Sequence, residues 1–211
     1  MGLQHDFDEI ELLSRTAAGL RPWAFAGKPA PRLMFFTDPA RTPDPEAIAE
    51  RLPRGSAVVY RAFGAAQAEA TARRLRAIAT GRGLVLLIGA DPALAEAVAA
   101  DGVHMPERLI SQIPALKAQH PAWLITAAAH DAPAATAASR AGVDAIVVSP
   151  VFASLSPSAG KPLGLDGLKG VMSASGAPAY ALGGVTGRTA AQLLGSEVIG
   201  LAGVEAFSPR T

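Results

Sequence analysis

Two pairs of small residues follow apolar runs near the end of the chain and could bind a phosphate. Gly183-Gly184 ends the run AYALGG, and Ala202-Gly203 ends the run VIGLAG. Small residues at such places can serve tight packing between a strand and a helix, or they can let backbone N–H groups approach a ligand closely. A phosphate is the ligand that N–H groups at a helix start usually bind. The packing explanation stays open, and the second explanation predicts a phosphate cradle formed by Gly183, Gly184, Ala202 and Gly203.

Several charged side chains elsewhere could also do chemistry. Arg61 follows the apolar run SAVVY, and an arginine at the end of a buried strand is costly without a partner, which favours an anion-facing role. His130 could act as a base or a donor, although a capping role explains it equally well. Lys161 lies in a loop rich in Ser, Pro and Gly, where a solvated lysine is as expected as a ligand contact. Asp38 and Arg41 could pair near the site or be ordinary turn residues.

Eight short apolar runs alternate with Ala-rich helical patterns along the chain. The predicted strands cover residues 32–37, 56–61, 84–89, 102–105, 122–127, 145–150, 179–184 and 198–203. The predicted helices cover residues 43–51, 66–80, 92–100, 107–119, 131–141, 165–175 and 187–194. Several strands are apolar on both faces, as expected when helices cover one side and a core fills the other. This α/β alternation predicts parallel βα units, and eight of them favour a closed (β/α)8 TIM barrel over an open doubly wound sheet.

The barrel prediction gathers these side chains at one end of the molecule. In a βα barrel the site lies at the carboxyl ends of the strands, and the loops after the seventh and eighth strands form the usual phosphate pocket. Asp91 and Asp131 stand where helix N-caps belong, with Pro92 at a natural first helical position. The cradle glycines therefore lie where this fold binds phosphate.

The chain is expected to form a single barrel domain over residues 1–211, because no linker rich in Pro, Gly or Ser divides it. In this prediction residues 31–207 form the barrel and residues 1–30 form an N-terminal extension. The stretch DFDEIELLSRTAAGL has apolar residues at helical spacing and could pack across the bottom of the barrel. A truncated C-terminal helix is expected, since the sequence stops at Thr211. The N-terminal segment, or the partner in a homodimer, is expected to cover the wall that this helix would leave bare.

Composition and charge exclude several classes of function. The 211 residues carry a formal net charge of +1 at pH 7, without a basic stripe, which argues against a nucleic-acid partner. The chain has no Cys, so disulfides, thiolate metal sites and cysteine nucleophiles are excluded. Its start lacks the apolar run of a secretory signal, and no apolar stretch approaches the ~20 residues needed to cross a bilayer. A cytoplasmic protein without a membrane partner is the expectation.

Five motifs lie in order along the chain: FFTDPAR, GVHM, AGVDAIVVSPVFASLSPSAGKPLGLDGL, ALGGVTGRTAAQLL and EVIGLAGVEAF. Together they resemble the family of thiamine phosphate synthase and its sister group, the thiazole tautomerases. The resemblance runs from residue 32 to 207. It implies a (β/α)8 barrel that joins hydroxymethylpyrimidine diphosphate to a thiazole phosphate and releases pyrophosphate. It also implies that Mg2+ holds the diphosphate and that the phosphorylated thiazole binds the glycine cradle.

The resemblance implies roles for residues in other loops as well. Arg61 matches an arginine after the second strand that the family aims at the diphosphate, and His130 matches a histidine after the fifth strand. Ser154 and Ser156 stand where the family has a hydroxyl-rich stretch, and Lys161 takes the place of a lysine that usually follows it directly. Arg61, His130 and Lys161 are therefore the implied catalytic residues, and Ser154 and Ser156 are implied to bind substrate.

The sequence departs from the family where the family holds Mg2+. Gly89-Ala90 stands in place of Asn-Asp after the third strand, and Glu107 lies in the stretch that the family writes Gly-Gln-x-Asp after the fourth. Magnesium requires hard oxygen ligands. Mg2+ is thus expected from the family while the residues predict no metal site, and Asp91 and Glu107 are the only carboxylates near the expected position.

Two further departures concern the ligand. Phe63 stands where the family usually has a lysine, and Ser149 replaces a tautomerase histidine at the end of the sixth strand and is expected to bind substrate. The main prediction is a divergent thiamine phosphate synthase-like protein of thiamine biosynthesis. Two alternatives stay open: a metal-independent, tautomerase-like enzyme of the same family, or a non-catalytic protein that binds a phosphorylated ligand.

Overall fold

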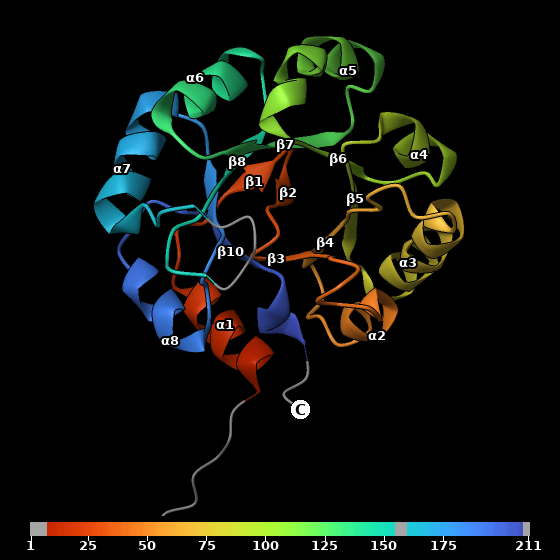
Figure 1. The fold of residues 1–211 in the computed structure, drawn as a ribbon, viewed down its shortest axis with the longest axis horizontal. Coiled ribbons are helices and arrows are strands. Elements are labelled where there is room, and N and C mark those ends of the chain that lie inside the picture. The colour runs from red at the N-terminus through yellow and green to blue at the C-terminus, as the bar shows by residue number, and fades with distance from the viewer. Residues whose placement is uncertain (1–7, 155–159, 209–211) are drawn as a thin grey trace, which may run out of the picture.

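Eight parallel strands close into a barrel, which Figure 1 shows as a ring of strands inside a ring of helices. The computed structural model describes residues 8–154 and 160–208. Around the barrel the strands are hydrogen-bonded in the order β10-β3-β4-β5-β6-β7-β8-β9. Their bounds are β3 Leu33–Phe36, β4 Ala57–Tyr60, β5 Val85–Gly89, β6 Gly102–Met105, β7 Leu124–Ala129, β8 Ala145–Val148, β9 Ala179–Ala181 and β10 Gly200–Gly203. The predicted (β/α)8 TIM barrel is confirmed.

Helices cover the outside of the barrel (Figure 1). They are α1 Glu9–Ala18, α2 Pro45–Ala49, α3 Ala68–Arg82, α4 Pro92–Ala97, α5 Ile113–Gln119, α6 Ala132–Arg140, α7 Gly164–Ser175 and α8 Gly187–Ala190, with 3-10 turns η1 Glu107–Gln112, η2 Ala191–Leu193 and η3 Glu205–Phe207. The predicted N-caps are confirmed, because the side chains of Asp91 and Asp131 accept hydrogen bonds from backbone N–H groups in the first turns of α4 and α6. Within the described residues, no helix combines the length and the apolar character needed to cross a membrane.

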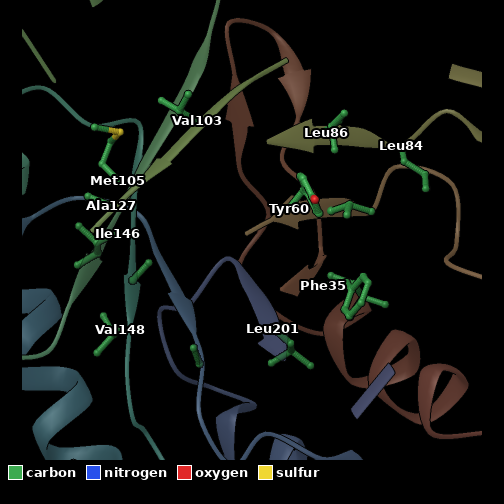
Figure 2. Close-up of a cluster of buried hydrophobic side chains, with 14 of the residues drawn as sticks. Phe35, Tyr60, Leu84, Leu86, Val103, Met105, Ala127, Ile146, Val148 and Leu201 are labelled. Atoms are coloured by element: carbon green, nitrogen blue, oxygen red, sulfur yellow. The ribbon is translucent and has the colours of Figure 1, made fainter. Parts of the chain in front are cut away.

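Side chains of each strand alternate between two apolar layers. In β3, Leu33 and Phe35 belong to the layer between strands and helices, whereas Met34 and Phe36 belong to the layer inside the barrel. Figure 2 shows part of the outer layer, with Phe35, Leu86 and Leu201 on three different strands. Because both faces of each strand are buried, their unbroken apolar runs follow directly from the fold.

Two aspartates connect neighbouring strands at the amino-terminal end of the barrel. Asp101 Oδ2 accepts a hydrogen bond of 2.7 Å from the backbone N–H of Leu86, and Asp144 Oδ2 accepts one of 2.7 Å from the N–H of Ile125. Each aspartate lies just before one strand and accepts the N–H of the strand that precedes it around the barrel. Lys117 Nζ also pairs with Asp144, so that carboxylate is held by a cation and by the backbone together.

A short hairpin closes the amino-terminal end of the barrel. Its strands β1 (Ala24–Phe25) and β2 (Lys28–Pro29) pair antiparallel, and the ring of Phe25 packs against the inner apolar layer. Figure 1 shows the hairpin projected onto the centre of the ring of strands. Because β3 begins soon after the hairpin, the hairpin lies where the strands start, at the end opposite the predicted site. The apolar pattern did not predict it.

Helix α1 lies on the outer wall, so the prediction that it packs across the bottom of the barrel is wrong. Ile10, Leu13 and Ala17 join the outer apolar layer, and the helix contacts β3, β10, α8 and η3. In this fold a helix that follows the eighth strand would cover that part of the wall. The amphipathic pattern shows that one face of α1 is buried, but it does not specify the surface that buries it.

Candidate functional site

A cavity of about 890 Å³ opens at the carboxyl ends of the strands. Residues from the loops after all eight barrel strands line it, including Arg41 after β3, which is the location that the fold predicts. The lining includes Arg61, Phe63 and Gly64 after β4, Ala90 and Asp91 after β5, Arg108 after β6, His130 after β7, Ser149 and Ser154 after β8, Gly183 to Thr186 after β9, and Val204 to Ala206 after β10. The cavity therefore brings together most of the predicted site residues.

The loop after β9 explains why two glycines stand between a strand and a helix. Gly183 and Gly184 have φ angles of +92° and +63°, a region that residues with a Cβ rarely adopt. A Cβ on Gly184 would lie 2.2 Å from the carbonyl oxygen of Ala153, and one on Gly183 would lie 2.8 Å from Pro150 Cα. Tight packing against the loop after β8 thus requires both glycines.

A second feature of the same two glycines is their backbone N–H groups. Among the described residues, no atom accepts a hydrogen bond from the N–H of Gly183 or Gly184. The helix that follows is capped by its own residues, because Thr186 and Thr189 form a reciprocal capping box. Buried or half-buried N–H groups are costly without an acceptor. The packing explanation and the ligand explanation for these glycines are therefore compatible.

The loop after β10 meets this loop at the same cavity. Gly203 lines the cavity with Val204, Glu205 and Ala206, which form the start of η3. Ala202 does not line it: its side chain is buried in the inner layer of the barrel, and β10 pairs it with Met34 of β3. The structure thus brings Gly203 to the cavity beside Gly183 and Gly184, and it leaves Ala202 in the core.

Arg61 projects from the end of β4 toward the cavity and is held by the loop after β3. Its Nε donates to the carbonyl oxygen of Thr37 at 2.7 Å, and its backbone N–H donates to Thr37 Oγ1 at 2.9 Å. Its Nη2 lies 3.6 Å from Asp38 Oδ2, which is an ion pair but too long for a hydrogen bond, and this buried atom has no acceptor among the described residues. Burial lowers the pKa of Arg61 to about 10 against the attraction of Asp38, so the guanidinium stays charged at neutral pH.

Asp38 and Arg41 form a pair beside this arginine. Arg41 Nη2 lies 2.9 Å from Asp38 Oδ2. Burial acts to raise the pKa of Asp38, but hydrogen bonds from Arg41 outweigh it and the pKa is lowered. Asp38 thus faces two guanidinium groups. Glu205 adds a second carboxylate on this side of the cavity, with its Oε2 4.0 Å from Arg41 Nη1.

His104 points into the barrel beneath the cavity and is neutral. Its Nδ1 lies 3.0 Å from Thr126 Oγ1, and its ring meets the ring of Phe36 edge-on. Burial lowers the pKa of His104 to about 3, with further repulsion from Arg61 and His130. A neutral imidazole on the cavity floor can accept or donate a hydrogen bond without adding charge.

His130 is fixed by Glu107, a partner that sequence reasoning considered only as a metal ligand. Glu107 Oε1 accepts from the backbone N–H of His130 at 2.7 Å and lies 2.6 Å from its ring Nδ1. Because an ionised carboxylate only accepts hydrogen bonds, Nδ1 carries the proton and Nε2 has the free lone pair in the neutral ring. The arrangement can accept a proton from a ligand in the cavity that His130 lines.

The remaining predicted residues divide between the cavity and its surroundings. Ser149 and Ser154 line the cavity. Lys161 is exposed and is not among the lining residues, while Ser156 falls outside the described residues. Among the lining residues, Arg108 was not singled out by the sequence, because nothing in its spacing distinguishes it from a solvated arginine.

The donor set does not fit Mg2+. Asp91 lines the cavity, but its Oδ1 accepts a hydrogen bond of 2.9 Å from Leu94 as the cap of α4. Glu107 is bound to His130. Across residues 8–154 and 160–208, no group of three or more His, Asp or Glu side chains lies close enough to hold a metal ion. Magnesium is held by hard oxygen ligands, often one or two carboxylates, and both carboxylates near the expected position already accept hydrogen bonds from the protein.

A TIM barrel with glycines in its last two loops, and with N–H groups in the loop after β9 that have no acceptor among the described residues, has the features of the barrels that bind phosphate at this end. The chain belongs to the thiamine monophosphate synthase family, whose family model matches residues 33–207. This membership confirms the resemblance of the five motifs.

Curated relatives and solved structures agree with this assignment. The chain is 34% identical over 136 residues to a putative thiamine-phosphate synthase 2 of Aquifex aeolicus, covering 64% of this chain and 73% of the relative. It is 33% identical over 141 residues to a thiamine-phosphate synthase of Chloroflexus aurantiacus, covering 64% of this chain and 62% of the relative. A thiamine phosphate pyrophosphorylase from Pyrococcus furiosus superposes with a TM-score of 0.69 at 24% identity, over 82% of this chain and 85% of that chain. A 2-keto-3-deoxy-6-phosphogluconate aldolase of Zymomonas mobilis superposes with a TM-score of 0.62 at 17% identity, over 94% of this chain and 88% of that chain. At these identities the two structures support the fold alone.

Proposed function

We propose that this protein is an enzyme of thiamine biosynthesis that joins hydroxymethylpyrimidine diphosphate to thiazole phosphate. Membership of the thiamine monophosphate synthase family supports this function. The observation that carries it is the loop after β9, because Gly183 and Gly184 line the cavity together with Gly203 and their N–H groups have no acceptor within the described chain. A phosphate dianion bound there would satisfy donors that the fold leaves unpaired.

Residues at the two ends of the cavity would bind the two substrates. The cradle would hold the phosphate of the thiazole, which orients its ring nitrogen toward the centre of the cavity. Arg61 would face the diphosphate of the other substrate. The bond between the pyrimidine methylene carbon and the diphosphate oxygen breaks with its electron pair leaving on pyrophosphate, and the thiazole nitrogen forms the new C–N bond. The fixed charge of Arg61 then stabilises the departing group, and we propose no role for Lys161, which is solvated.

One observation favours a second candidate, a metal-independent and tautomerase-like enzyme of the same family. Glu107 fixes the ring of His130 so that Nε2 is free to accept a proton, and such a pair is typical of general bases. This candidate uses the same phosphate cradle, with proton transfer on the bound heterocycle as the chemical step. Ser149 and Ser154 would bind the ligand in either case.

A direct assay separates these functions. Purified protein is incubated with both substrates, with and without MgCl2, and thiamine phosphate is measured by fluorescence after oxidation. The proposal predicts product with the wild type and a loss of at least tenfold in rate with Arg61→Gln, while Arg54→Gln, at an exposed arginine away from the cavity, stays unchanged. Conversion of a thiazole tautomer without synthesis would support the second candidate. Binding of thiazole phosphate with neither reaction would leave a non-catalytic binding protein.

A further inference from the structure

Phe63 combines two features that are unfavourable for folding. It has the largest exposed fraction of the large apolar side chains described as exposed, at 67%, and it alone of these lines the cavity. Its φ angle is +49°, and the other described non-glycine residues with positive φ are all alanines. A bulky residue in this region is a true outlier, and such strain of roughly 1–3 kcal/mol persists mainly at functional positions.

The local structure shows how the strain arises. The backbone N–H of Ala65 donates to the carbonyl oxygen of Ala62 at 2.9 Å, so residues 62–65 form a tight turn with Phe63 and Gly64 at its centre. Both central residues have positive φ, which is the pattern of a type I′ turn. Glycine, asparagine or aspartate would fit the first central position without strain, but this chain has phenylalanine there.

One face of the Phe63 ring is already supported. The guanidinium carbon of Arg61 lies 5.1 Å from the centre of the Phe63 ring and 5.6 Å from the centre of the Phe36 ring. Arg61 is in turn held by hydrogen bonds to Thr37. Phe63 therefore rests on a fixed cation and leaves much of its surface exposed at the cavity.

We propose that Phe63 is a stacking platform for a planar heteroaromatic ring at the end of the ligand remote from the phosphate. Aromatic rings bind such rings by offset stacking, and a charged guanidinium beside the platform favours a ring with polar edges. The position of the loop identifies which ring is involved. β4 is separated from β10 by β3 and from β9 by two strands, so a ring over Phe63 lies away from the phosphate cradle. This inference rests on the proposed function and assigns the pyrimidine ring to Phe63.

The test compares thiazole phosphate with thiamine phosphate, which carries the same phosphate and thiazole and adds the pyrimidine ring. Dissociation constants are measured by calorimetry for the wild type, Phe63→Asn and Phe63→Tyr. Asparagine fits the turn and removes the ring, whereas tyrosine keeps the ring. We expect Phe63→Asn to weaken thiamine phosphate binding about three- to tenfold and to leave thiazole phosphate within about twofold, and Phe63→Tyr to match the wild type. The melting temperature of Phe63→Asn should equal or exceed that of the wild type, because backbone strain is relieved.

The outcomes separate the platform from the proposed function. The platform would be overturned if Phe63→Asn weakened the binding of both ligands equally, weakened neither, or lowered the melting temperature. In each of these cases, binding of thiazole phosphate by the wild type would still support the cradle. Failure of the wild type to bind thiazole phosphate would overturn the proposed function, and the platform with it.

Discussion

Replacing Gly184 by alanine tests whether the loop after β9 is shaped by packing. The new Cβ would lie 2.2 Å from the carbonyl oxygen of Ala153 and 2.8 Å from the carbonyl carbon of Phe152, both backbone atoms that cannot rotate away. The positive φ of +63° adds about 1–2 kcal/mol for a residue with a Cβ, and overpacking adds about 1–3 kcal/mol. The free energy of unfolding should therefore fall by about 2–5 kcal/mol.

Gly195 provides a matched control for this substitution. Its φ is +80°, and a Cβ there would meet no atom within 4 Å. Gly195→Ala should lose only the backbone contribution of about 1–2 kcal/mol, measured by urea unfolding with both variants side by side. Equal losses in the two variants would refute the steric argument.

The same pair of variants tests the phosphate cradle. A shift of the backbone at Gly184 displaces N–H groups that must converge on one ligand. Calorimetric titration should show thiazole phosphate binding at least about tenfold weaker in Gly184→Ala than in the wild type, with Gly195→Ala unchanged. Wild-type affinity in a folded Gly184→Ala protein would show that these N–H groups do not hold the phosphate.

Buried and paired groups away from the glycines affect stability and metal binding in ways that unfolding and titration can measure. The pKa of His104 is lowered to about 3 by burial and by the nearby Arg61 and His130. Between about pH 6.5 and 3 the unfolded chain therefore binds a proton at this residue that the folded chain does not, and the free energy of unfolding should fall by on the order of 1 kcal/mol per pH unit as the pH is lowered. Urea unfolding measures this, and a wild type that loses no more stability than His104→Asn over the same range would contradict it. Asp144→Asn removes the charged group that accepts the Ile125 N–H and should lower the free energy of unfolding by about 1–2 kcal/mol. A loss below ~0.5 kcal/mol, which is the level of an exposed ion pair, would show that the hydrogen bond from Asp144 to β7 does not stabilise the barrel. Calorimetry of the protein alone with MgCl2 should give no saturable binding below millimolar concentration, and a tighter site would show that carboxylates rearrange to form one.

The barrel could be predicted because its signal is repeated and local. Eight apolar runs, each buried on both faces, leave few architectures, and the chain order of strand and helix specifies the parallel closure. The ends of the strands were less predictable. The run AYALGG was predicted as strand to residue 184, but β9 ends at Ala181 because the glycines after it turn with positive φ.

The N-terminal segment shows where sequence reasoning fails. The helical spacing of its apolar residues predicted α1, but the surface that buries it depends on a wall formed by β3 and β10, far away in the sequence. The hairpin was missed because its strands are only two residues long and show no alternation. Its turn carries Ala26 and Gly27 at positive φ, and alanine there gives no turn signal.

The location of the site could be predicted from the sequence, but the contacts between its side chains could be predicted less well. Barrel topology predicted that Arg61, His130 and the glycines lie at one end of the barrel, and these residues line the cavity there. The pairing of His130 with Glu107 spans 23 positions, and no local pattern encodes such a contact. Ala202 was grouped with Gly203 because both are small, but neighbouring strand residues face opposite sides of the sheet.

The residue types at the two ends of the cavity have different structural causes. At the cradle, glycines are required because backbone atoms of the loop after β8 lie within 2.8 Å of where a Cβ would be, so a substitution there costs stability whatever the ligand is. The turn at residues 62–65 is exposed and would be more stable with asparagine than with Phe63. Packing alone can therefore explain the glycines of the proposed cradle, whereas the strained phenylalanine requires a separate explanation. A ligand contact supplies one, and it predicts that the choice of ligand among phosphorylated heterocycles is determined at β4 and not at the cradle.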